Sequence, residues 1–257
     1  MLKELDVLIF GGQSNMEGQT EGPPETNIPV ENAFEYRFAQ DNLIPLAHPV
    51  GESVENLIFG ATMGCGSLVP DCCRSYVNAT GRTVVAIHAA CGNTRIDEWS
   101  KGTPRYDCAL KKITAGIEKA KTLGNIRKIY YVWLQGESDA INRTSEDEYI
   151  RLLTTYKNDL KTDIGIEKFG IIEVGYFCKT VRWLTDRTKD DGKACDEAIM
   201  RAQESLPSID NDFVMLTQIC KTLSLDERYI NPFEDGHYNN LAMELIGKEA
   251  GIALSKL

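Results

Sequence analysis

The sequence predicts an α/β protein of one domain, built on a parallel sheet that helices cover on both faces. The chain has 257 residues, of which 42% are hydrophobic, so it can bury one substantial core, and no low-complexity linker divides residues 1–257. Short runs that are apolar throughout indicate strands buried on both faces. These runs alternate with longer segments of helical period, which is the order typical of a parallel sheet.

The expected elements follow one another along the chain. The first strand is expected at residues 5–10 and stops at Gly11 and Gly12. Further strands are expected at residues 83–90, 128–134, 170–175 and 213–216. Helices are expected at residues 106–123, 145–163, 193–206 and 239–256. Each of the first three helices therefore lies between two strands, and the fourth follows the last strand.

Polar clusters follow three of the expected strands. Residues 11–16, 91–95 and 135–139 come directly after a strand, and a fourth cluster, residues 234–239, precedes the last helix. Ligands of parallel sheets bind outside the carboxyl ends of the strands, where the connecting loops gather. We therefore expect the four segments to contribute to one functional site.

The charge balance argues against two classes of partner. The chain has 28 Lys and Arg residues against 38 Asp and Glu residues, a net charge of -10. Such a protein repels the phosphate backbone of nucleic acids and the anionic surface of membranes. Neither nucleic acid nor a membrane is an expected partner.

The first residues and the cysteines predict a reduced, cytoplasmic protein without a metal. Residues 1–6 carry two acids, and the apolar run after them stops at Gly11, which does not resemble a signal peptide. The eight cysteines include the adjacent pair Cys72 and Cys73, a poor unit for a disulfide framework. There is no Cys-x-x-Cys pair and there are three histidines, so a metal site has few ligands available. No metal or other cofactor is expected.

Ser14 is the candidate nucleophile. It follows two glycines at the end of a buried strand, where its hydroxyl and nearby backbone N–H groups could face one reacting atom. The alternative is that Ser14 caps the helix that follows. Met16 stands where the nucleophile elbow Gly-x-Ser-x-Gly requires its second glycine, so the sequence does not predict an α/β-hydrolase elbow.

His237 is the candidate base for such a serine. Histidine is the side chain whose pKa suits proton transfer near neutral pH. His88 lies inside an apolar run and is expected in the core, and His48 precedes a proline in a loop that suggests a surface position. His237 instead lies in a polar loop, with Glu234 and Asp235 shortly before it.

These segments together resemble the conserved blocks of the SGNH-hydrolase superfamily. The matching blocks are Gly-Gln-Ser-Asn-Met-x-Gly (12–18), Cys-Gly-Asn-Thr-Arg-Ile-Asp-Glu-Trp (91–99), Trp-Leu-Gln-Gly-Glu-Ser-Asp (133–139) and Asp-Gly-His-Tyr-Asn (235–239). More narrowly, they are similar to the sialate O-acetylesterase and acetylxylan esterase group, which includes carbohydrate esterase family six. The blocks keep their order and span nearly the whole chain.

The resemblance implies a three-layer, flavodoxin-like α/β/α fold and a serine esterase that removes acetyl groups from a carbohydrate such as acetylxylan or a xylo-oligosaccharide. Ser14 would form an acetyl-serine intermediate with His237 as base. The oxyanion would be met by the backbone N–H of Ser14, by that of a glycine, and by the side-chain amide of Gln135. We assign the glycine as Gly66, with Gly64 as the alternative; the Gly-Cys-Gly segment could also be an ordinary turn.

The resemblance leaves the acid partner of the histidine open. Glu234 holds the position three residues before His237, where much of the superfamily has Asp, and Glu137 is the glutamate of Gln-Gly-Glu that some relatives use. We rank Glu234 slightly ahead of Glu137, with Asp235 third. A longer stem makes Glu234 a workable replacement for Asp.

The block after the strand at 83–90 is expected to line the sugar site. Its candidates are Asn93, Arg95 and Trp99, since an aromatic face packs well on a pyranose. The alternative for Arg95 and Trp99 is that they anchor the loop. Asp139 is expected to organise its own loop by buried hydrogen bonds rather than to catalyse.

Three other functions remain as alternatives. The same serine chemistry could act on an O-acetylated sialic acid or on another short-chain acyl ester. A carbohydrate-binding module without catalysis would be expected to lack Ser14, His237 or Gln135, and all three are present. A metal-dependent hydrolase lacks the His and Asp spacing that a two-metal site needs.

Overall fold

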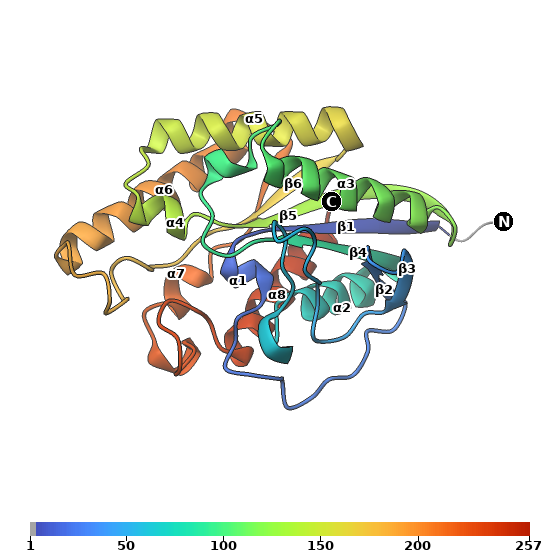
Figure 1. Ribbon diagram of the computed structural model, residues 1–257, viewed down its shortest axis with the longest axis horizontal. Coiled ribbons are helices and arrows are strands. Elements are labelled where there is room, and N and C mark those ends of the chain that lie inside the picture. Colours follow the sequence, from blue (N-terminus) through green and yellow to red (C-terminus); the bar gives the residue numbers. More distant parts are fainter. Residues whose placement is uncertain (1–3) are drawn as a thin grey trace.

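A seven-stranded sheet runs through the centre of the computed structural model, which describes residues 4–257 (Figure 1). The strands are β1 (Glu4–Gly12), β2 (Ala33–Arg37), β3 (Asn42–Pro45), β4 (Thr83–Ala90), β5 (Asn125–Leu134), β6 (Lys168–Ile172) and β7 (Phe213–Thr217). Their order across the sheet is β3-β2-β4-β1-β5-β6-β7. All neighbouring pairs are parallel except β2 and β3, which form an antiparallel edge.

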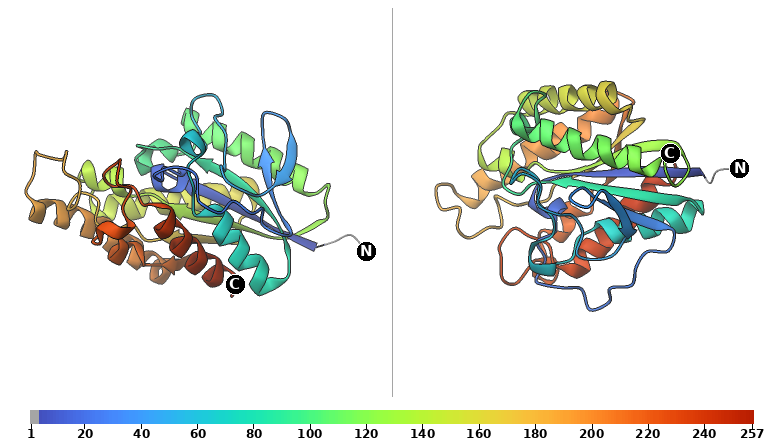
Figure 2. Two further views of the ribbon diagram at one scale, coloured as in Figure 1. Left: turned by 90° about the horizontal axis from the view of Figure 1, so that it is seen from below. Right: turned by 45° about the vertical axis from the view of Figure 1, so that its right-hand side comes forward.

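Two helical layers cover the sheet, as Figures 1 and 2 show. One layer holds α3 (Pro104–Ala120), α5 (Glu146–Ile164) and α6 (Lys189–Ile209). The other holds α2 (Val69–Thr80) and α8 (Asn240–Leu254), with the short helices α1 (Ser14–Glu17) and α7 (Cys220–Leu223). The helix α4 (Glu137–Ile141) follows β5, and single turns of 3-10 helix lie at η1 (Thr62–Gly64), η2 (Ile96–Trp99) and η3 (Glu227–Tyr229). None of the described helices is long and apolar enough to cross a membrane.

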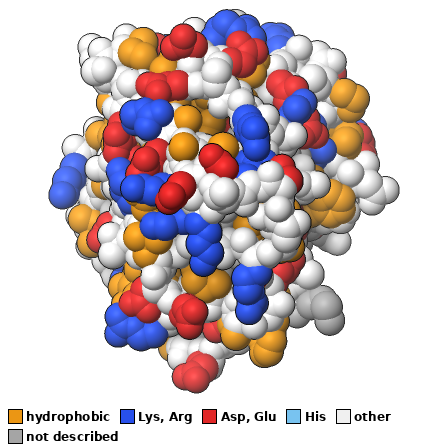
Figure 3. Space-filling view, turned by 90° about the vertical axis from the view of Figure 1, so that its left-hand side faces the viewer, with side chains coloured by type: hydrophobic (Ala, Val, Ile, Leu, Met, Phe, Trp, Pro, Cys, Tyr) orange, Lys and Arg blue, Asp and Glu red, His pale blue; other side chains and the backbone are white. Residues whose placement is uncertain are grey.

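The three central strands end at the same level. Gly12, the last residue of β1, is in register with Ala90 of β4 and with Leu134 of β5. The loops that leave these strands therefore start side by side, on the left of Figure 1. Figure 3 views the molecule from that side, where hydrophobic, acidic and basic side chains are interspersed on the surface.

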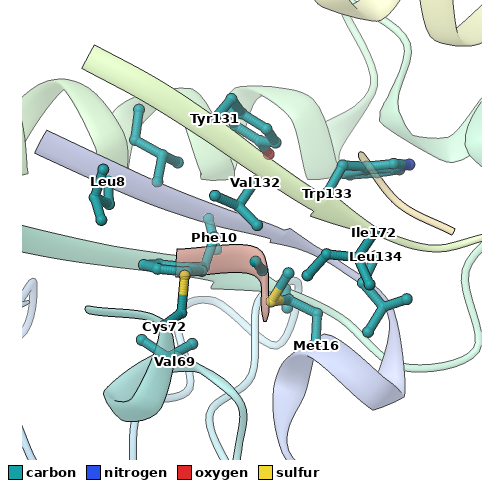
Figure 4. Packing of buried hydrophobic residues seen from close by; sticks show 14 of the residues in the cluster. Leu8, Phe10, Met16, Val69, Cys72, Tyr131, Val132, Trp133, Leu134 and Ile172 are labelled. Atoms are coloured by element: carbon teal, nitrogen blue, oxygen red, sulfur yellow. The ribbon is translucent and has the colours of Figure 1, made fainter. Parts of the chain in front are cut away.

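The core is packed on both faces of the central strands (Figure 4). Phe10, Met16, Val132 and Leu134 lie on the face toward α2 and α8, while Tyr131 and Trp133 point to the opposite face. On that second face, aromatic rings pack edge to face, such as Tyr131 and Tyr156 with their centroids 5.9 Å apart. Contacts of this kind contribute about 0.5–1.5 kcal/mol each beyond the area they bury.

Caps specify where the long helices begin. The side chain of Ser145 accepts the N–H of Glu148 at the start of α5, and the side chain of Asn239 accepts the N–H of Ala242 at the start of α8. Such caps bond N–H groups that have no acceptor within the helix, each worth about 1 kcal/mol. The cap at Asn239 has a functional consequence, because it ends the loop that carries His237.

The predicted α/β fold is confirmed, and the structure adds elements that the sequence did not reveal. All five predicted strands and all four predicted helices are present, with ends that differ by a few residues. The strands β2 and β3 were missed, since β2 includes Glu35 and Arg37, which pair at 2.9 Å and interrupt any apolar run. The helix α2 was also missed, although its buried residues recur at helical spacing: Val69, Cys72, Cys73, Tyr76 and Val77. The expectation of one domain over residues 1–257 stays a prediction.

Candidate active site

A cleft of about 400 Å³ lies where the loops after β1, β4 and β5 meet. Its lining combines polar residues from these loops with aromatic and charged residues from later in the chain. The lining residues are Gln13, Ser14, Glu17, Gln19, Phe59, Gly92, Asn93, Ser138, Ile141, Phe177, Trp183, Glu234 and His237. The fold thus brings Ser14 and His237 into one cavity, as a serine and its base require.

Ser14 is the first residue of α1, directly after the turn that ends β1. The turn depends on Gly12, which has a φ of +145° and whose added Cβ would lie 2.0 Å from the carbonyl oxygen of Leu134. Gln13 holds the N-cap position, so Ser14 does not cap the helix. The N–H of Ser14 belongs to the first turn and has no acceptor within the helix, which leaves it available to an oxyanion.

His237 lies in the loop before α8 and is 8% exposed. Its backbone is fixed by a hydrogen bond from the N–H of Asn231 to the His237 carbonyl, at 2.8 Å. Burial lowers the pKa of His237 below its usual value, and the nearby carboxylate of Glu234 opposes this shift only in part. The imidazole is therefore neutral at pH 7 and able to accept a proton.

The three candidate acids have different surroundings. Oε2 of Glu234 lies 3.6 Å from Nδ1 of His237, just beyond hydrogen-bond distance, and no other described group bonds this nitrogen. Asp235 instead forms an ion pair with Arg182, at 2.7 Å and 2.9 Å, which holds the pKa of Asp235 below its usual range. Glu137 is buried and accepts a hydrogen bond from Nδ2 of Asn15 at 2.8 Å, and burial raises its pKa. Of the three, Glu234 is the carboxylate beside the imidazole.

Gln135 does not reach the cleft. It is fully buried, and its Nε2 donates to the carbonyl of Thr94 at 2.9 Å and to Oδ2 of Asp139 at 2.5 Å. Its Oε1 accepts the hydroxyl of Tyr149 at 3.1 Å. The resemblance implied that this amide is an oxyanion donor, but in the fold it links two loops through buried hydrogen bonds. Asp139, as expected, organises its loop by buried hydrogen bonds.

Gly66 also lies away from the cleft. Its N–H donates to Oγ1 of Thr20 at 2.7 Å, and a Cβ at this position would meet the side chain of Asn240. Gly64, the alternative glycine, faces Pro23. The oxyanion role expected of Gly66 or Gly64 does not fit this geometry, because the N–H of Gly66 is already bonded and neither glycine lines the cavity with Ser14.

The loop after β4 supplies different groups to the cleft. Gly92 and the exposed Asn93 both line it, and a Cβ on Gly92 would lie 3.4 Å from that of Ser14. The N–H of Gly92 donates to Oε2 of Glu17 at 2.6 Å, which links this loop to the helix that begins at Ser14. Asn93 was expected to contact the sugar, and its place in the same cavity as Ser14 makes its amide a candidate oxyanion donor as well.

Arg95 and Trp99 are not among the residues that line the cleft. Arg95 pairs with Asp97 at 2.6 Å, and the buried Trp99 donates its indole N–H to Oγ1 of Thr94 at 3.1 Å. The Trp99 ring also packs edge to face on Trp133, with centroids 5.5 Å apart. This geometry supports loop anchoring, the alternative raised from the sequence, for Trp99, whereas Arg95 forms a partly exposed ion pair within its own segment.

The other two histidines lie outside the cleft. His88 is completely buried, and its Nε2 is 3.1 Å from the carbonyl oxygen of Met16. Burial lowers the pKa of His88 to about 3, so it stays neutral in the core. His48 is half-buried rather than on the surface, and its Nδ1 accepts the N–H of Ser67 at 3.3 Å.

Sequence reasoning missed several residues of the cleft. Glu17 follows Ser14 by one helical turn, but a glutamate in a short polar segment carries no pattern of its own. Phe177 and Trp183 lie between β6 and α6, in a segment without periodicity. The signal available for them was the presence of aromatic residues in an otherwise polar loop that follows a strand. The described residues contain no group of three His, Cys, Asp or Glu side chains that could hold a metal ion.

Comparison with known proteins identifies a family and a curated relative. The model of the family described as carbohydrate esterase, sialic acid-specific acetylesterase matches residues 4–217. A probable carbohydrate esterase of Arabidopsis thaliana is 24% identical over 251 residues, which cover 88% of this chain and 91% of the relative.

Solved structures show the same fold. The X-ray structure of an Arabidopsis thaliana protein matches with a TM-score of 0.70 at 17% identity and covers 99% of both chains. An acetylxylan esterase of Geobacillus stearothermophilus matches with a TM-score of 0.51 at 11% identity, covering 97% of this chain and 93% of that one. Because the family model matches most of the chain, the protein is a carbohydrate esterase with the SGNH-hydrolase fold and belongs to the sialic acid-specific acetylesterase family.

Proposed function

We propose that the protein hydrolyses O-acetyl esters of a carbohydrate, of the acetylxylan or xylo-oligosaccharide type, through an acetyl-serine intermediate. The observation that carries this proposal is the shared cleft of Ser14 and His237, in which Glu234 lies 3.6 Å from the imidazole nitrogen Nδ1. A carboxylate at Nδ1 orients the ring and stabilises its protonated form, so that Nε2 is free to accept the proton of the serine hydroxyl.

In the first half-reaction, the hydroxyl oxygen of Ser14 attacks the carbonyl carbon of the acetyl group while Nε2 of His237 takes the hydroxyl proton. The tetrahedral intermediate then breaks its bond to the sugar oxygen. His237 returns the proton to that oxygen, so the sugar leaves as a neutral alcohol and the acetyl group stays on Ser14.

In the second half-reaction, water attacks the acetyl-serine. His237 takes a proton from the water as the new carbon–oxygen bond forms and returns it to Oγ of Ser14 when the intermediate collapses. Acetic acid leaves and loses its proton to solvent to give acetate, and the free serine is restored. No step requires a group beyond the side chains of the cleft and one water molecule.

The oxyanion donors that we propose are the backbone N–H of Ser14 and the side-chain amide of Asn93. The first lies at the start of α1, where it has no helical acceptor. The second lines the same cavity as the serine. A donor of this kind stabilises the developing negative charge by roughly 3–4 kcal/mol in serine hydrolases.

The experiment that tests the proposal measures acetate release from acetylated xylo-oligosaccharide and from p-nitrophenyl acetate. Ser14→Ala is expected to lower kcat by roughly 10⁴- to 10⁶-fold, because the covalent route is lost. Ser138→Ala is the matched control, since it makes the same change in the same cleft at a residue with no proposed chemical role. Ser14→Ala turnover equal to that of the wild type would refute the mechanism.

The alternative substrate is an O-acetylated sialic acid, which the description of the matched family favours. A second alternative is another short-chain acyl ester. Initial rates on acetyl, butyryl and octanoyl esters of one alcohol distinguish an acetylesterase from an esterase of longer acyl chains. The proposed acetylesterase is expected to act fastest on the acetyl ester.

A further inference from the structure

A second cavity adjoins the proposed active site. It has a volume of about 480 Å³, within the range of small-molecule sites, and is lined by Phe177, Arg182, Trp183, Phe233, Glu234, Asp235 and His237. Four of these residues, including Glu234 and His237, line the first cleft as well. His237 therefore lies at the junction of the two cavities.

The walls of this second cavity carry unusually exposed aromatic rings. Trp183 is 55% exposed and Phe233 is 83% exposed. Among the large hydrophobic residues that are exposed in the described part of the chain, these two are the aromatic ones, and both line this cavity. Exposed apolar side chains that gather at one place, rather than being scattered singly, mark ligand-binding grooves or other interaction sites.

Several contacts hold the loop that carries Trp183 against the loop that carries Phe233 and His237. Phe177 packs edge to face on Trp183, with centroids 6.0 Å apart, and its ring lies so close to Gly236 that an added Cβ there would overlap it. The ion pair of Arg182 with Asp235 joins the same two loops. The loop of Trp183 is thereby fastened to the loop of His237, which gives Asp235 a structural role.

We propose that this second cavity is the subsite for the sugar, and that it selects an uncharged glycan whose pyranose face stacks on Trp183 and Phe233. The inference rests on the proposed function. The sugar oxygen that leaves must lie within hydrogen-bond reach of His237, because the imidazole protonates it. The ring attached to that oxygen then extends from the junction over the aromatic side chains, whose apolar faces suit the C–H face of a pyranose.

The charges of the two cavities favour an uncharged sugar. Among the described lining residues, the carboxylates are Glu17, Glu234 and Asp235, and the single Lys or Arg is Arg182. Asp235 already pairs with Arg182, so the charge of this guanidinium is offset within the cavity and the carboxylate of Glu234 is left uncompensated by a Lys or Arg among the described lining residues. In the second cavity, a carboxylated sugar such as sialic acid would place its negative charge near Glu234, an unfavourable arrangement of like charges.

The first experiment compares Trp183→Ala with Ile209→Ala on two esters. Ile209 is 55% exposed like Trp183 but lies at the end of α6, away from both cavities. Trp183→Ala is expected to raise KM for acetylated xylotriose roughly 5- to 10-fold, the range of one aromatic contact, and to affect ethyl acetate, which has no sugar ring, less than the glycan. Ile209→Ala is expected to leave the kinetics on both esters unchanged. Trp183→Phe is expected to recover part of the loss.

Two results of that experiment overturn the subsite: an unchanged KM for the glycan, or equal losses on both esters. Failure of the proposed function looks different, because the wild-type protein would then hydrolyse neither acetylated xylotriose nor ethyl acetate.

The second experiment tests the charge selection with one matched pair, 9-O-acetyl-N-acetylneuraminic acid and its methyl ester. The two compounds differ only in the carboxylate. The methyl ester is expected to show at least a roughly 5-fold higher kcat/KM at low ionic strength, and the difference is expected to shrink as salt screens the charges. Equal or faster hydrolysis of the free acid overturns the selection of an uncharged sugar.

Discussion

Asn15 donates a hydrogen bond through Nδ2 to Oε1 of Glu137 at 2.8 Å, one residue after the proposed nucleophile. The same amide donates to the carbonyl of Gly236, and its Oδ1 accepts the N–H of Tyr238, both at 3.3 Å. These two backbone groups flank His237. Asn15 therefore joins the turn of the nucleophile, the loop after β5 and the loop of the histidine, and it helps to set the distance between serine and base.

Removal of this link is expected to cost stability. In Asn15→Ala, the buried carboxyl of Glu137 and the backbone near His237 lose their partners, a loss of about 2–4 kcal/mol in the free energy of unfolding. Urea unfolding followed by circular dichroism measures it. Asn211→Ala, at an exposed position, is the control and is expected to change stability by less than about 0.5 kcal/mol. Equal stabilities of the two variants would contradict the role of Asn15.

Glu234 and Glu137 are expected to respond differently to amide substitution. Glu234→Gln removes the charge beside the imidazole and is expected to lower kcat by roughly 10²- to 10⁴-fold, as loss of a triad acid does elsewhere. Glu137→Gln keeps an oxygen that can accept from Asn15 and is expected to keep kcat within about tenfold of the wild type. Steady-state kinetics on p-nitrophenyl acetate decides between them, and the reverse order would make Glu137 the triad acid.

Substitutions of Asn93 and Gln135 are expected to affect different properties, catalysis for Asn93 and stability for Gln135. Asn93→Ala is expected to lower kcat by roughly 10²- to 10³-fold, because its amide lines the cleft. Its cost in stability is expected to be small, since the side chain is exposed and the change only replaces Asn by Ala at a φ of +55°. Gln135→Ala strips partners from Thr94, Asp139 and Tyr149 in the interior and is expected to lower the melting temperature. Thermal unfolding and kinetics on both variants test this, and a normal kcat in Asn93→Ala would exclude its amide as the donor.

The pH dependence of kcat/KM is expected to follow His237. The imidazole must be neutral to accept the serine proton, so activity falls as pH drops through its pKa, which burial places below the usual value of 6.5. Glu234→Gln removes the carboxylate that raises this pKa, and the inflection in its residual activity is expected to move lower still. A pH–rate profile of the wild type with its acid inflection above 7 would exclude this environment for the base.

Much of the fold was predictable because its signals are local. An apolar run such as that of β4, Thr83–Ala90, indicates a buried strand without reference to any distant residue. The edge strand β3 and its neighbour β2 lack such a run. In β2, the buried Glu35 is tolerated through partners such as Arg37 and the N–H of Gly51. Those partners become visible only in three dimensions.

The residues of the candidate site also fall into two groups, those that local sequence identifies and those whose role depends on contacts in the folded chain. The positions of Ser14 and His237 after a strand and before a helix made them candidates from the sequence, and the structure brings both to one cleft. The roles expected of Gln135, Gly66, Arg95 and Trp99 depended on where their side chains and N–H groups point. A sequence motif does not specify which way a side chain or an N–H group points. In the fold, the donors of these four residues bond to groups outside the cleft.

The sequence by itself determined five of the strands, the four long helices α3, α5, α6 and α8, and the turn that presents Ser14, because apolar runs, caps and glycines act over a few residues. Only the tertiary structure decided which carboxylate stands beside His237 and which aromatic rings border it. Glu234 and Glu137 are both plausible neighbours along the chain, but Asn15 holds Glu137 in the interior while Glu234 lies 3.6 Å from the imidazole. Such distances result from the packing of segments far apart in sequence.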